Sequence, residues 1–242
     1  MKLKASLHIH TSEDKTDGHV IKYNVYKLID EAKKYDFKIL ALTCHKKFEC
    51  KKEHIDYAKK NGILLIPGVE LALRKFLRNN DVLVLNCEEN VEKIKNFADL
   101  IKYKKNHPEI FIIAPHPLFG IKESIGKNKL IKYINVFDAV ENSWFYSKFV
   151  NFNKKAKKIA KKYKKPFIST SDAHVLTYFN KDYTIIETEK LNIESVFKAI
   201  KANKFTNITE PKSLYKLIFY IIFFKIKQII FWPMKYELLK NK

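Results

Sequence analysis

The sequence predicts an α/β fold in which parallel strands are wrapped by helices, either as an open doubly wound sheet or as a barrel. Short apolar, β-rich runs alternate along the chain with longer amphipathic, lysine-rich stretches. A hydrophobic fraction of 46%, with only 5 Gly and 7 Pro, also excludes collagen-like and broadly disordered chains. At 242 residues the chain can form one large domain with a well-filled core.

The alternation predicts individual elements in order. We expect strands at residues 3–10, 38–43, 63–71, 82–86, 110–114, 139–142, 167–170 and 183–188. We expect helices at residues 24–35, 54–60, 91–103 and 153–163. In the last helix, Ala156, Ile159, Ala160 and Tyr163 recur at helical spacing and predict a buried stripe with a solvated lysine face. No glycine-rich phosphate loop follows the first strand, which argues against Rossmann and P-loop folds.

The chain is strongly basic, and nearly all of its basic residues are lysine rather than arginine. It has 47 basic and 26 acidic residues, a net charge of +21, which usually indicates nucleic acid or an anionic membrane as a partner. Only Arg74 and Arg78 are arginines, and arginine supplies the bidentate fork that reads phosphates and base edges. Part of the charge therefore reflects a lysine-rich composition, and a nucleic-acid partner stays an alternative.

Cysteine content and the first residues indicate the compartment. Cys44, Cys50 and Cys87 are few, odd in number and without CxxC spacing, so neither a disulfide framework nor a zinc knuckle is indicated. Histidine appears at position 8, before any apolar signal region could form. We therefore expect a cytoplasmic protein.

The ends of the predicted strands carry the informative side chains. His8 and His10 end the first strand on one face, while Leu7 and Ile9 point to the other. Other strands end at His45, Glu70, His116, Asp172 and His174, whereas His54 lies in a helix and His19 and His107 lie in loops. Imidazole and carboxylate bind zinc, manganese or iron, and the carboxyl ends of barrel strands meet at one face. A buried Glu70 would be costly unless paired or bound to metal. The pattern predicts a metal-lined pocket.

An ordered set of motifs resembles the PHP (polymerase and histidinol phosphatase) metal-dependent phosphoesterases over residues 1–205. The set comprises His8-Ile9-His10-Thr11, Asp17-Gly18, Thr43-x-His45, Ile66-Pro67-Gly68-Val69-Glu70, His116-Pro117, Glu141-Asn142 and Ser171-Asp172-Ala173-His174. The resemblance implies a distorted seven-stranded (β/α) TIM-like barrel that holds two or three divalent metal ions. It implies His8, His10, Glu70 and Asp172 as ligands of one metal, with Glu70 bridging to a second that also uses His116. Asp17, His45 and His174 resemble the ligands of a further site, and Asn142 stands where some relatives place another ligand.

Two positions depart from the family pattern. Cys44 stands where relatives usually have an aspartate, and we interpret it as a small buried hydrophobe rather than a ligand. Many relatives carry a histidine just before the fourth strand, where this chain has Asp81, which either replaces that ligand or only begins a strand.

The residue types also indicate a mechanism. No GxSxG elbow or low-pKa cysteine offers a covalent nucleophile, so we expect a metal-bound hydroxide to attack. Either His174, His45 or His19 could protonate the leaving oxygen. Among the basic residues after the strands, Lys46, Lys47 and Arg74 are candidates to hold the phosphoryl oxygens, or they are plain surface charges.

The chain changes character after residue 210. Residues 211–242 contain seven Lys and one Glu around an apolar stretch at 217–234. Lys225, Lys227 and Gln228 interrupt that stretch, which argues against a membrane-spanning helix. The segment fits either an interfacial helix that attaches peripherally to a membrane surface through 213–234, or a helix that packs on the barrel bottom or a second subunit.

We therefore predict a barrel domain at 1–210 and an apolar, basic helical extension at 211–242. The predicted function is metal-dependent hydrolysis of phosphate esters with zinc, manganese or iron, acting on a phosphorylated small molecule or nucleotide. Two alternatives remain: a nuclease whose lysines follow a nucleic-acid backbone, and a non-catalytic, metal-stabilised adaptor for a membrane or partner. Oligomeric state and the choice between mono- and diesters are left open.

Overall fold

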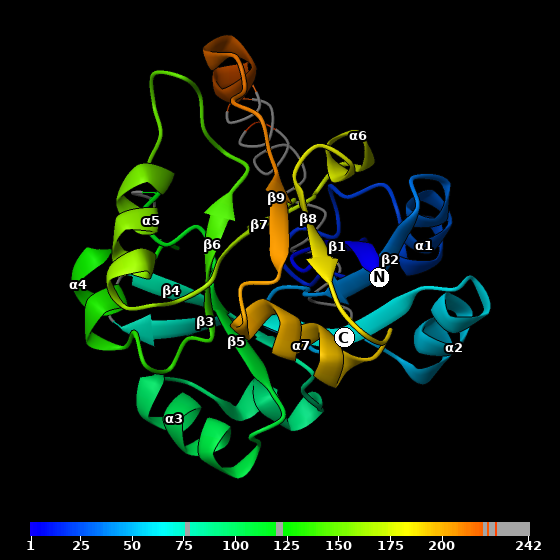
Figure 1. Cartoon of the computed structure of the whole chain (residues 1–242), viewed down its shortest axis with the longest axis horizontal. Coiled ribbons are helices and arrows are strands. Elements are labelled where there is room, and N and C mark those ends of the chain that lie inside the picture. The colour runs from blue at the N-terminus through cyan, green and yellow to red at the C-terminus, as the bar shows by residue number, and fades with distance from the viewer. Residues whose placement is uncertain (76–77, 120–122, 220–221, 223–225, 227–242) are drawn as a thin grey trace.

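The computed structural model describes residues 1–75, 78–119, 123–219, 222 and 226 (Figure 1). In this part of the chain a nine-stranded sheet, ordered β7-β6-β5-β4-β3-β2-β1-β8-β9, curls into a nearly closed barrel. The strands are β1 Lys2–Ser6, β2 Phe37–Leu42, β3 Leu64–Lys75, β4 Arg78–Leu85, β5 Phe111–Ala114, β6 Ala139–Ser143, β7 Phe167–Thr170, β8 Tyr183–Glu187 and β9 Phe205–Ile208. The helices are α1 Val25–Lys34, α2 Lys52–Lys60, η1 Glu89–Lys93, α3 Phe97–Asn106, α4 Lys127–Lys132, α5 Asn153–Lys162, α6 Leu176–Phe179 and α7 Ile193–Lys201.

All eight predicted strands form, and the barrel is confirmed. The predicted helices at 24–35, 54–60 and 153–163 correspond to α1, α2 and α5, whereas the predicted helix at 91–103 divides into η1 and α3. Strand β9 and helices α4, α6 and α7 were not predicted. Side-chain capping explains some of the helix starts: the Asn24 and Asn192 side chains accept hydrogen bonds from Lys27 N and Ser195 N.

The expectation of parallel strands throughout is wrong for part of the sheet. Strands β1, β2 and β3 are parallel, as are β5, β6 and β7, but β4 runs antiparallel to both of its neighbours. Lys75 and Arg78 pair with each other across the β3–β4 connection, which is far too short for the crossover that parallel strands need. Strand β8 likewise runs antiparallel to β1 and β9.

Side chains close the barrel where the backbone ladder is missing. Strand β9 supplies Asn207, whose Nδ2 donates to Phe167 O at 2.7 Å and whose Oδ1 accepts from Ser169 N at 2.8 Å. Thr184 of β8 donates its hydroxyl to Ser169 O at 2.8 Å. These contacts hold β7 beside β8 and β9 and satisfy polar groups that would otherwise be buried without partners.

The barrel interior is apolar up to the ends of its strands. The interior cluster takes at least one side chain from each of β1 to β8: Ala5, Ile39, Ala41, Ile66, Leu83, Leu85, Phe111, Ile113, Ala139, Ile168 and Ile186. Helix α7 closes one end, with Phe197 stacked on Phe111 at a centroid distance of 4.6 Å. The outer helices cover two further clusters, and the predicted stripe Ala156, Ile159 and Ala160 of α5 is buried in one of them.

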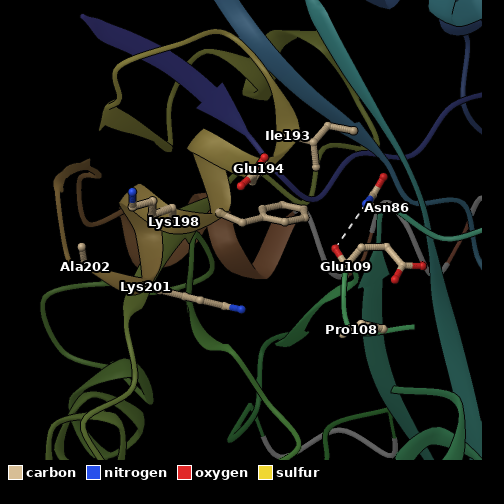
Figure 2. A pocket seen from close by; sticks show the side chains of 9 residues that line it. Asn86, Pro108, Glu109, Ile193, Glu194, Lys198, Lys201 and Ala202 are labelled. Carbon is tan, nitrogen blue, oxygen red and sulfur yellow. Dashed lines mark hydrogen bonds between the residues drawn. The ribbon is translucent and has the colours of Figure 1, made fainter. Parts of the chain in front are cut away.

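A cavity of about 760 Å³ lies at the α7 end (Figure 2). Asn86, Glu109, Lys198 and Lys201 are among its lining residues, and Asn86 Nδ2 donates to Glu109 O at 3.2 Å. The residues that line it include no histidine or cysteine. The side chains predicted to bind metal lie at the opposite end of the barrel.

The predicted extension is described only in part. Residues 214–219, 222 and 226 are helical, and the rest of the apolar stretch lies outside the described residues. Within the described part of the chain, no helix combines the length and apolarity that crossing a membrane requires.

Candidate metal centre

The strand ends carry the predicted ligands to one edge of the barrel. Ile9 bridges to Ala173 and His45 bridges to Glu70, so segments distant in sequence are fixed side by side. The backbone bonds Thr43 N to Ile9 O and Lys46 N to Glu70 O, at 3.0 and 2.8 Å, continue this alignment. The expectation that Leu7 and Ile9 share a face is wrong, because β1 ends at Ser6 and its regular alternation ends there. Leu7 packs inside the barrel and Ile9 packs beneath α1.

Four side chains converge as ligands of a single ion would. His8 Nε2 and His10 Nε2 lie 3.1 Å apart. Glu70 Oε2 lies 3.1 and 3.3 Å from these nitrogens, and Asp172 Oδ1 lies 3.4 and 3.3 Å from them. Ligands about 2.1 Å from a tetrahedral ion stand about 3.4 Å apart. The donor set His8, His10, Glu70 and Asp172 therefore fits a divalent cation.

Glu70 also faces a second group. Its other oxygen, Oε1, lies 3.1 Å from His116 Nε2, and His8, Glu70 and His116 form a compact set of ligand atoms. His116 Nδ1 is buried and has no hydrogen-bond partner among the described residues. The backbone of His116 has φ 27° and that of Asp172 has φ 43°, in the left-handed region that non-glycine residues adopt infrequently and that is common at functional sites. The two oxygens of Glu70 thus face different histidines, as a bridging carboxylate requires.

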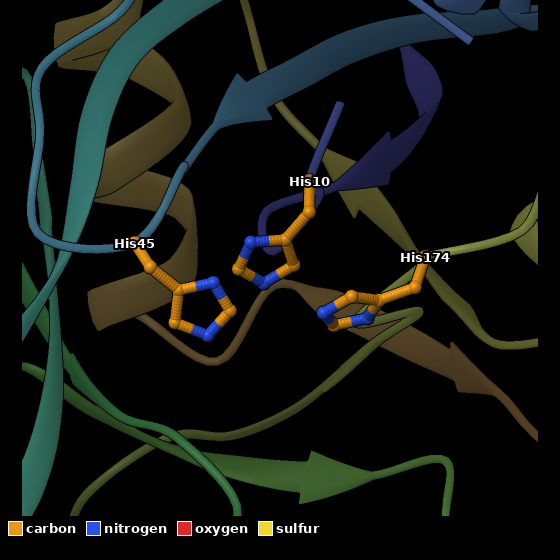
Figure 3. Close-up of side chains that lie close together, drawn as sticks. All are labelled: His10, His45 and His174. Carbon is orange, nitrogen blue, oxygen red and sulfur yellow. The ribbon is translucent and has the colours of Figure 1, made fainter. Parts of the chain in front are cut away.

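A third group lies beside the first (Figure 3). His10, His45 and His174 point toward one another, and the His10 ring lies 4.2 Å from the His45 ring and 4.3 Å from the His174 ring. Asp17 Oδ2 lies 3.4 Å from His174 Nε2 and 3.9 Å from His45 Nδ1. The structure therefore brings together Asp17, His45 and His174, which the family pattern had implied as one ligand set.

Two buried carboxylates that the sequence analysis did not select orient the histidines. Asp14 Oδ2 accepts from His10 Nδ1 at 2.9 Å, from His45 Nδ1 at 2.9 Å and from His45 N at 2.7 Å. Glu141 Oε1 lies 2.8 Å from His8 Nδ1, and Glu141 Oε2 accepts from His116 N at 2.5 Å. Holding Nδ1 in this way directs Nε2 into the site, the arrangement that metal-bound histidines usually show. The signal was present in the sequence: Glu141 ends an apolar strand, the argument that selected Glu70.

The loop that supplies Asp14 and Asp17 depends on a glycine. Gly18 N donates to Asp14 O at 2.8 Å. A Cβ on Gly18 would lie 2.3 Å from the carbonyl oxygens of Ser12 and Asp14, closer than any side chain allows. The loop can therefore fold tightly over the site only with glycine at position 18.

The charges of the site are strongly interdependent. Burial opposes protonation of His8, but the negative charges of Asp172, Glu70 and Glu141 outweigh it and raise the pKa of His8 well above its ordinary value. Burial also opposes protonation of His116, but the Glu70 carboxylate outweighs it and raises the pKa of His116 to about 9. Conversely, the imidazoles of His8 and His45 hold the pKa of Glu70 well below its usual value despite burial. A cation placed among these carboxylates would replace the protons.

The two departures from the family pattern have different surroundings. Cys44 is fully buried in the apolar cluster beneath α1, as interpreted from the sequence, and burial raises the pKa of its thiol to about 12. It belongs to none of the three ligand groups. Asp81 is buried on β4 on the same face of the sheet as Glu70, and burial and the charge of Glu70 raise its pKa to about 7. Asp81 therefore borders the site without joining the ligand groups found among the described residues.

The remaining predicted site residues lie outside the three groups. Asn142 Nδ2 donates to Ser169 Oγ at 2.9 Å, while the adjacent Glu141 faces the histidines. His19 is partly buried in the loop between β1 and α1. Lys46 is exposed with φ 62°, directly after His45, and Lys47 pairs with Glu49 at 3.0 Å. Arg74 lies on β3, and its side chain is outside the described part of the structure.

Comparison with solved structures gives the same architecture at low sequence identity. A two-domain protein from Bacteroides vulgatus, containing a predicted PHP-like metal-dependent phosphoesterase, matches with TM-score 0.67 and 16% identity over 87% of this chain and 65% of its own. PsfC from Pseudomonas syringae matches with TM-score 0.62 and 14% identity over 93% of this chain and 98% of its own. The lesion-specific endonuclease EndoQ from Pyrococcus furiosus matches with TM-score 0.56 and 16% identity over 84% of this chain and 56% of its own. The chain thus spans about two thirds of the Bacteroides protein.

Sequence comparison gives the family. No curated protein matches the chain. The profile of the PHP domain matches residues 6–176, which include every ligand of the three groups, and a profile described as PHP-associated matches residues 150–205. The chain belongs to the PHP domain family.

Proposed function

We propose that this chain, a metal-dependent hydrolase by its family, cleaves phosphate esters with two or three divalent ions, zinc, manganese or iron. The position of Glu70 carries the proposal. Its carboxylate is buried, and its two oxygens face separate histidine groups at hydrogen-bond distance. A carboxylate shared in this way supports neighbouring metal ions, which is the arrangement used for in-line displacement at phosphorus.

The ligand assignment follows the groups described above. His8, His10, Glu70 and Asp172 would hold one ion, and Glu70 and His116 would hold a second. Asp17, His45 and His174 would contribute to a third. Bound divalent ions lower the pKa of a bound water and neutralise phosphoryl charge.

Exposure separates residues that can reach substrate from those that cannot. The side chains of His8 and His10 are fully buried, whereas those of Asp172, His45, His116 and His174 are 19%, 18%, 11% and 10% exposed. Substrate therefore approaches over the edge formed by these four side chains. In a two-metal form, in which His45 and His174 bind no ion, we infer that one of them delivers the proton to the leaving oxygen, in preference to His19, which belongs to none of the ligand groups. Asp14 fixes Nδ1 of His45 and so orients its ring.

Basic side chains at this edge would hold the non-bridging oxygens. Lys46 is exposed, and its backbone nitrogen donates to Glu70 O, which places it at the rim of the site. We keep Arg74 as a second candidate for phosphoryl binding, on the sequence argument alone.

The proposal is tested by metal analysis followed by a substrate screen. Purified protein should contain two or three equivalents of transition metal. After chelation and reconstitution with Mn²⁺ or Zn²⁺, it should hydrolyse a phosphomonoester or a phosphodiester. A protein that binds metal stoichiometrically and cleaves neither class would refute phosphate-ester hydrolysis.

Nuclease activity is the second candidate, and the net charge of +21 favours it. Binding to an oligonucleotide should then weaken by orders of magnitude between 50 and 200 mM salt, as counterion release requires. Cys44, which replaces the usual family aspartate, lies outside the ligand groups. Its presence therefore gives no support to a non-catalytic adaptor. A cytoplasmic location and peripheral attachment to a membrane through 213–234 remain predictions.

A further inference from the structure

A loop with internal hydrogen bonds holds apolar side chains in solvent at the metal end of the barrel. Phe149 is 87% exposed, and Val150 and Phe152 are 42% and 40% exposed. The loop is fixed from within by Ser147, which is buried. Its Oγ accepts from Phe149 N at 3.2 Å and from Val150 N at 2.9 Å, and its N donates to Val150 O at 2.8 Å. The exposure of Phe149 is therefore a consequence of ordered structure.

The C-terminal segment presents a second apolar surface. Its exposed large apolar side chains are between 42% and 69% exposed, and they are Leu214, Tyr215, Ile218, Phe219, Ile222 and Ile226. At 100° per residue these positions fall within one face of a helix, and Leu217, on the opposite face, is only 4% exposed. Among the described residues of this segment, Leu217 is therefore buried and the other large apolar side chains face outward.

The two surfaces are tied together. Lys212 N donates to Tyr146 O at 2.8 Å, which joins the start of the C-terminal segment to the loop after β6. The Lys212 ammonium pairs with buried Asp182 at 2.6 Å, and Thr209 donates to the Tyr146 hydroxyl at 3.2 Å. Figure 1 shows both segments at the same end of the molecule, where β6 and β9 end. We call the two surfaces together the apolar rim.

The apolar rim borders the metal site. Strand β6 carries Glu141 into the site and leads directly into the loop. His116, Phe119, Phe145 and Phe152 line one small cavity of about 10 Å³. Phe119 packs edge-on against Phe145 at 4.5 Å and Phe152 at 5.8 Å. An aromatic wall thus connects the predicted ligand His116 with the rim.

The charge around the rim decides what covers it. Lys148, Lys154, Lys155 and Lys216 are exposed in or beside it, and residues 142–171 contain no Asp or Glu. A second copy of the chain packed rim to rim would bring these lysines against one another. Anionic lipid headgroups complement them, and exposed aromatic and aliphatic side chains gain free energy by entering the headgroup region.

We propose that the apolar rim docks on an anionic membrane, with the metal site facing it, and that the substrate is a phosphate monoester carried by a membrane lipid. The substrate class rests on the proposed phosphoesterase function, whereas docking does not. Membrane contact places the exposed edge of His45, His116, Asp172 and His174 next to headgroup phosphates.

The docking test uses the full-length protein and vesicles of phosphatidylglycerol or phosphatidylcholine. The wild type should float with phosphatidylglycerol vesicles, less so at 0.5 M salt, and weakly with phosphatidylcholine. The double variant Phe149→Asp, Phe219→Asp should bind phosphatidylglycerol vesicles at least tenfold more weakly. The matched control Ile101→Asp alters a side chain on α3 that is 48% exposed and should bind as the wild type does. Absence of flotation, equal loss in the control, or a wild-type dimer that the double variant converts to monomer without vesicle binding would overturn docking.

The substrate test compares a soluble and a membrane-borne phosphomonoester. The double variant should hydrolyse p-nitrophenyl phosphate at the wild-type rate and phosphatidic acid in vesicles at least tenfold more slowly. Wild-type protein that floats and cleaves only the soluble ester overturns the lipid substrate. Wild-type protein that floats and cleaves neither monoester overturns the lipid phosphomonoester as substrate and leaves docking confirmed. If it also fails to cleave a phosphodiester, the phosphoesterase proposal is overturned as well.

Discussion

At the end covered by α7, apolar contact fills the barrel: Phe111 stacks on Phe197, and Ile200 is fully buried with them. At the other end, Glu70, Glu141 and the imidazoles of His8 and His10 are just as buried, yet they carry charge or strong polarity. Burying an apolar side chain stabilises the fold, whereas burying a charge costs free energy unless it is paired. One end of the barrel therefore supplies stability, and the other holds its ligands in place at a cost that metal ions would offset.

The largest effect is expected from removing the shared carboxylate. Glu70→Gln should lose bound metal and lower phosphoester turnover by at least about a thousandfold. The reason is that each oxygen of the Glu70 carboxylate faces a different predicted histidine ligand. The variant should stay folded, because glutamine has the same shape. His107→Ala, which removes a histidine stacked on Tyr103 away from the site, should change neither quantity. Equal metal content in the wild type and Glu70→Gln, measured by elemental analysis, would disprove the ligand assignment.

Truncating a buried side chain at the α7 end of the barrel should lower the stability of the fold without changing metal binding. Phe197→Ala should lower the free energy of unfolding by about 3 to 5 kcal/mol, since it removes a buried ring and leaves a cavity. Metal content and turnover should persist at temperatures where the variant is folded. Leu191→Ala, at a side chain that is 38% exposed, should cost less than about 1 kcal/mol. Denaturant unfolding measures both, and loss of metal from folded Phe197→Ala would show that the two ends are coupled.

A smaller effect is expected from substituting a carboxylate that orients a predicted histidine ligand. Glu141→Gln should weaken metal affinity by about 10- to 100-fold, because glutamine no longer holds His8 Nδ1 as a carboxylate does. Glu109→Gln is a matched control, since Glu109 Oε1 makes the same kind of contact with His107 Nδ1, at 3.1 Å, on the surface. Competition with a chelator measures affinity. Equal affinities in the two variants would mean that Glu141 has no orienting role.

The smallest effect is a pH dependence that distinguishes the metal-free from the loaded site. Glu70 raises the pKa of His116 from 6.5 to about 9 in the folded chain. This proton stabilises the metal-free fold fully below about pH 6.5, and the stabilisation is lost as pH rises through about 9. Metal must displace the proton, so affinity should rise between pH 6.5 and 9, by about tenfold per pH unit for each proton released. A metal-free melting temperature and a metal affinity that are both constant over this range would contradict the charge arrangement.

The strand positions and most of the predicted ligands could be predicted from the amino-acid sequence. Apolar runs bounded by polar residues locate strands because burial depends on local pattern, and histidine or carboxylate at a strand end is visible in one dimension. His8, His10, His45, Glu70, His116, Asp172 and His174 could therefore be selected before any contact was known. The same reasoning, applied to Ala139-Val140-Glu141, would have selected Glu141 in place of Asn142.

The contacts that those residues make depend on the three-dimensional fold and could not be predicted from local sequence. Asp14 lies in a loop without periodicity, and its role appears when the fold brings it to His10 and His45. Strand direction in β4 and the contacts of β9 depend on partners distant in sequence, so a local pattern cannot specify them. The exposure of Leu214, Tyr215, Ile218 and Phe219 is likewise set by tertiary contacts, because the spacing of these apolar residues predicts a helix but not whether the barrel covers it.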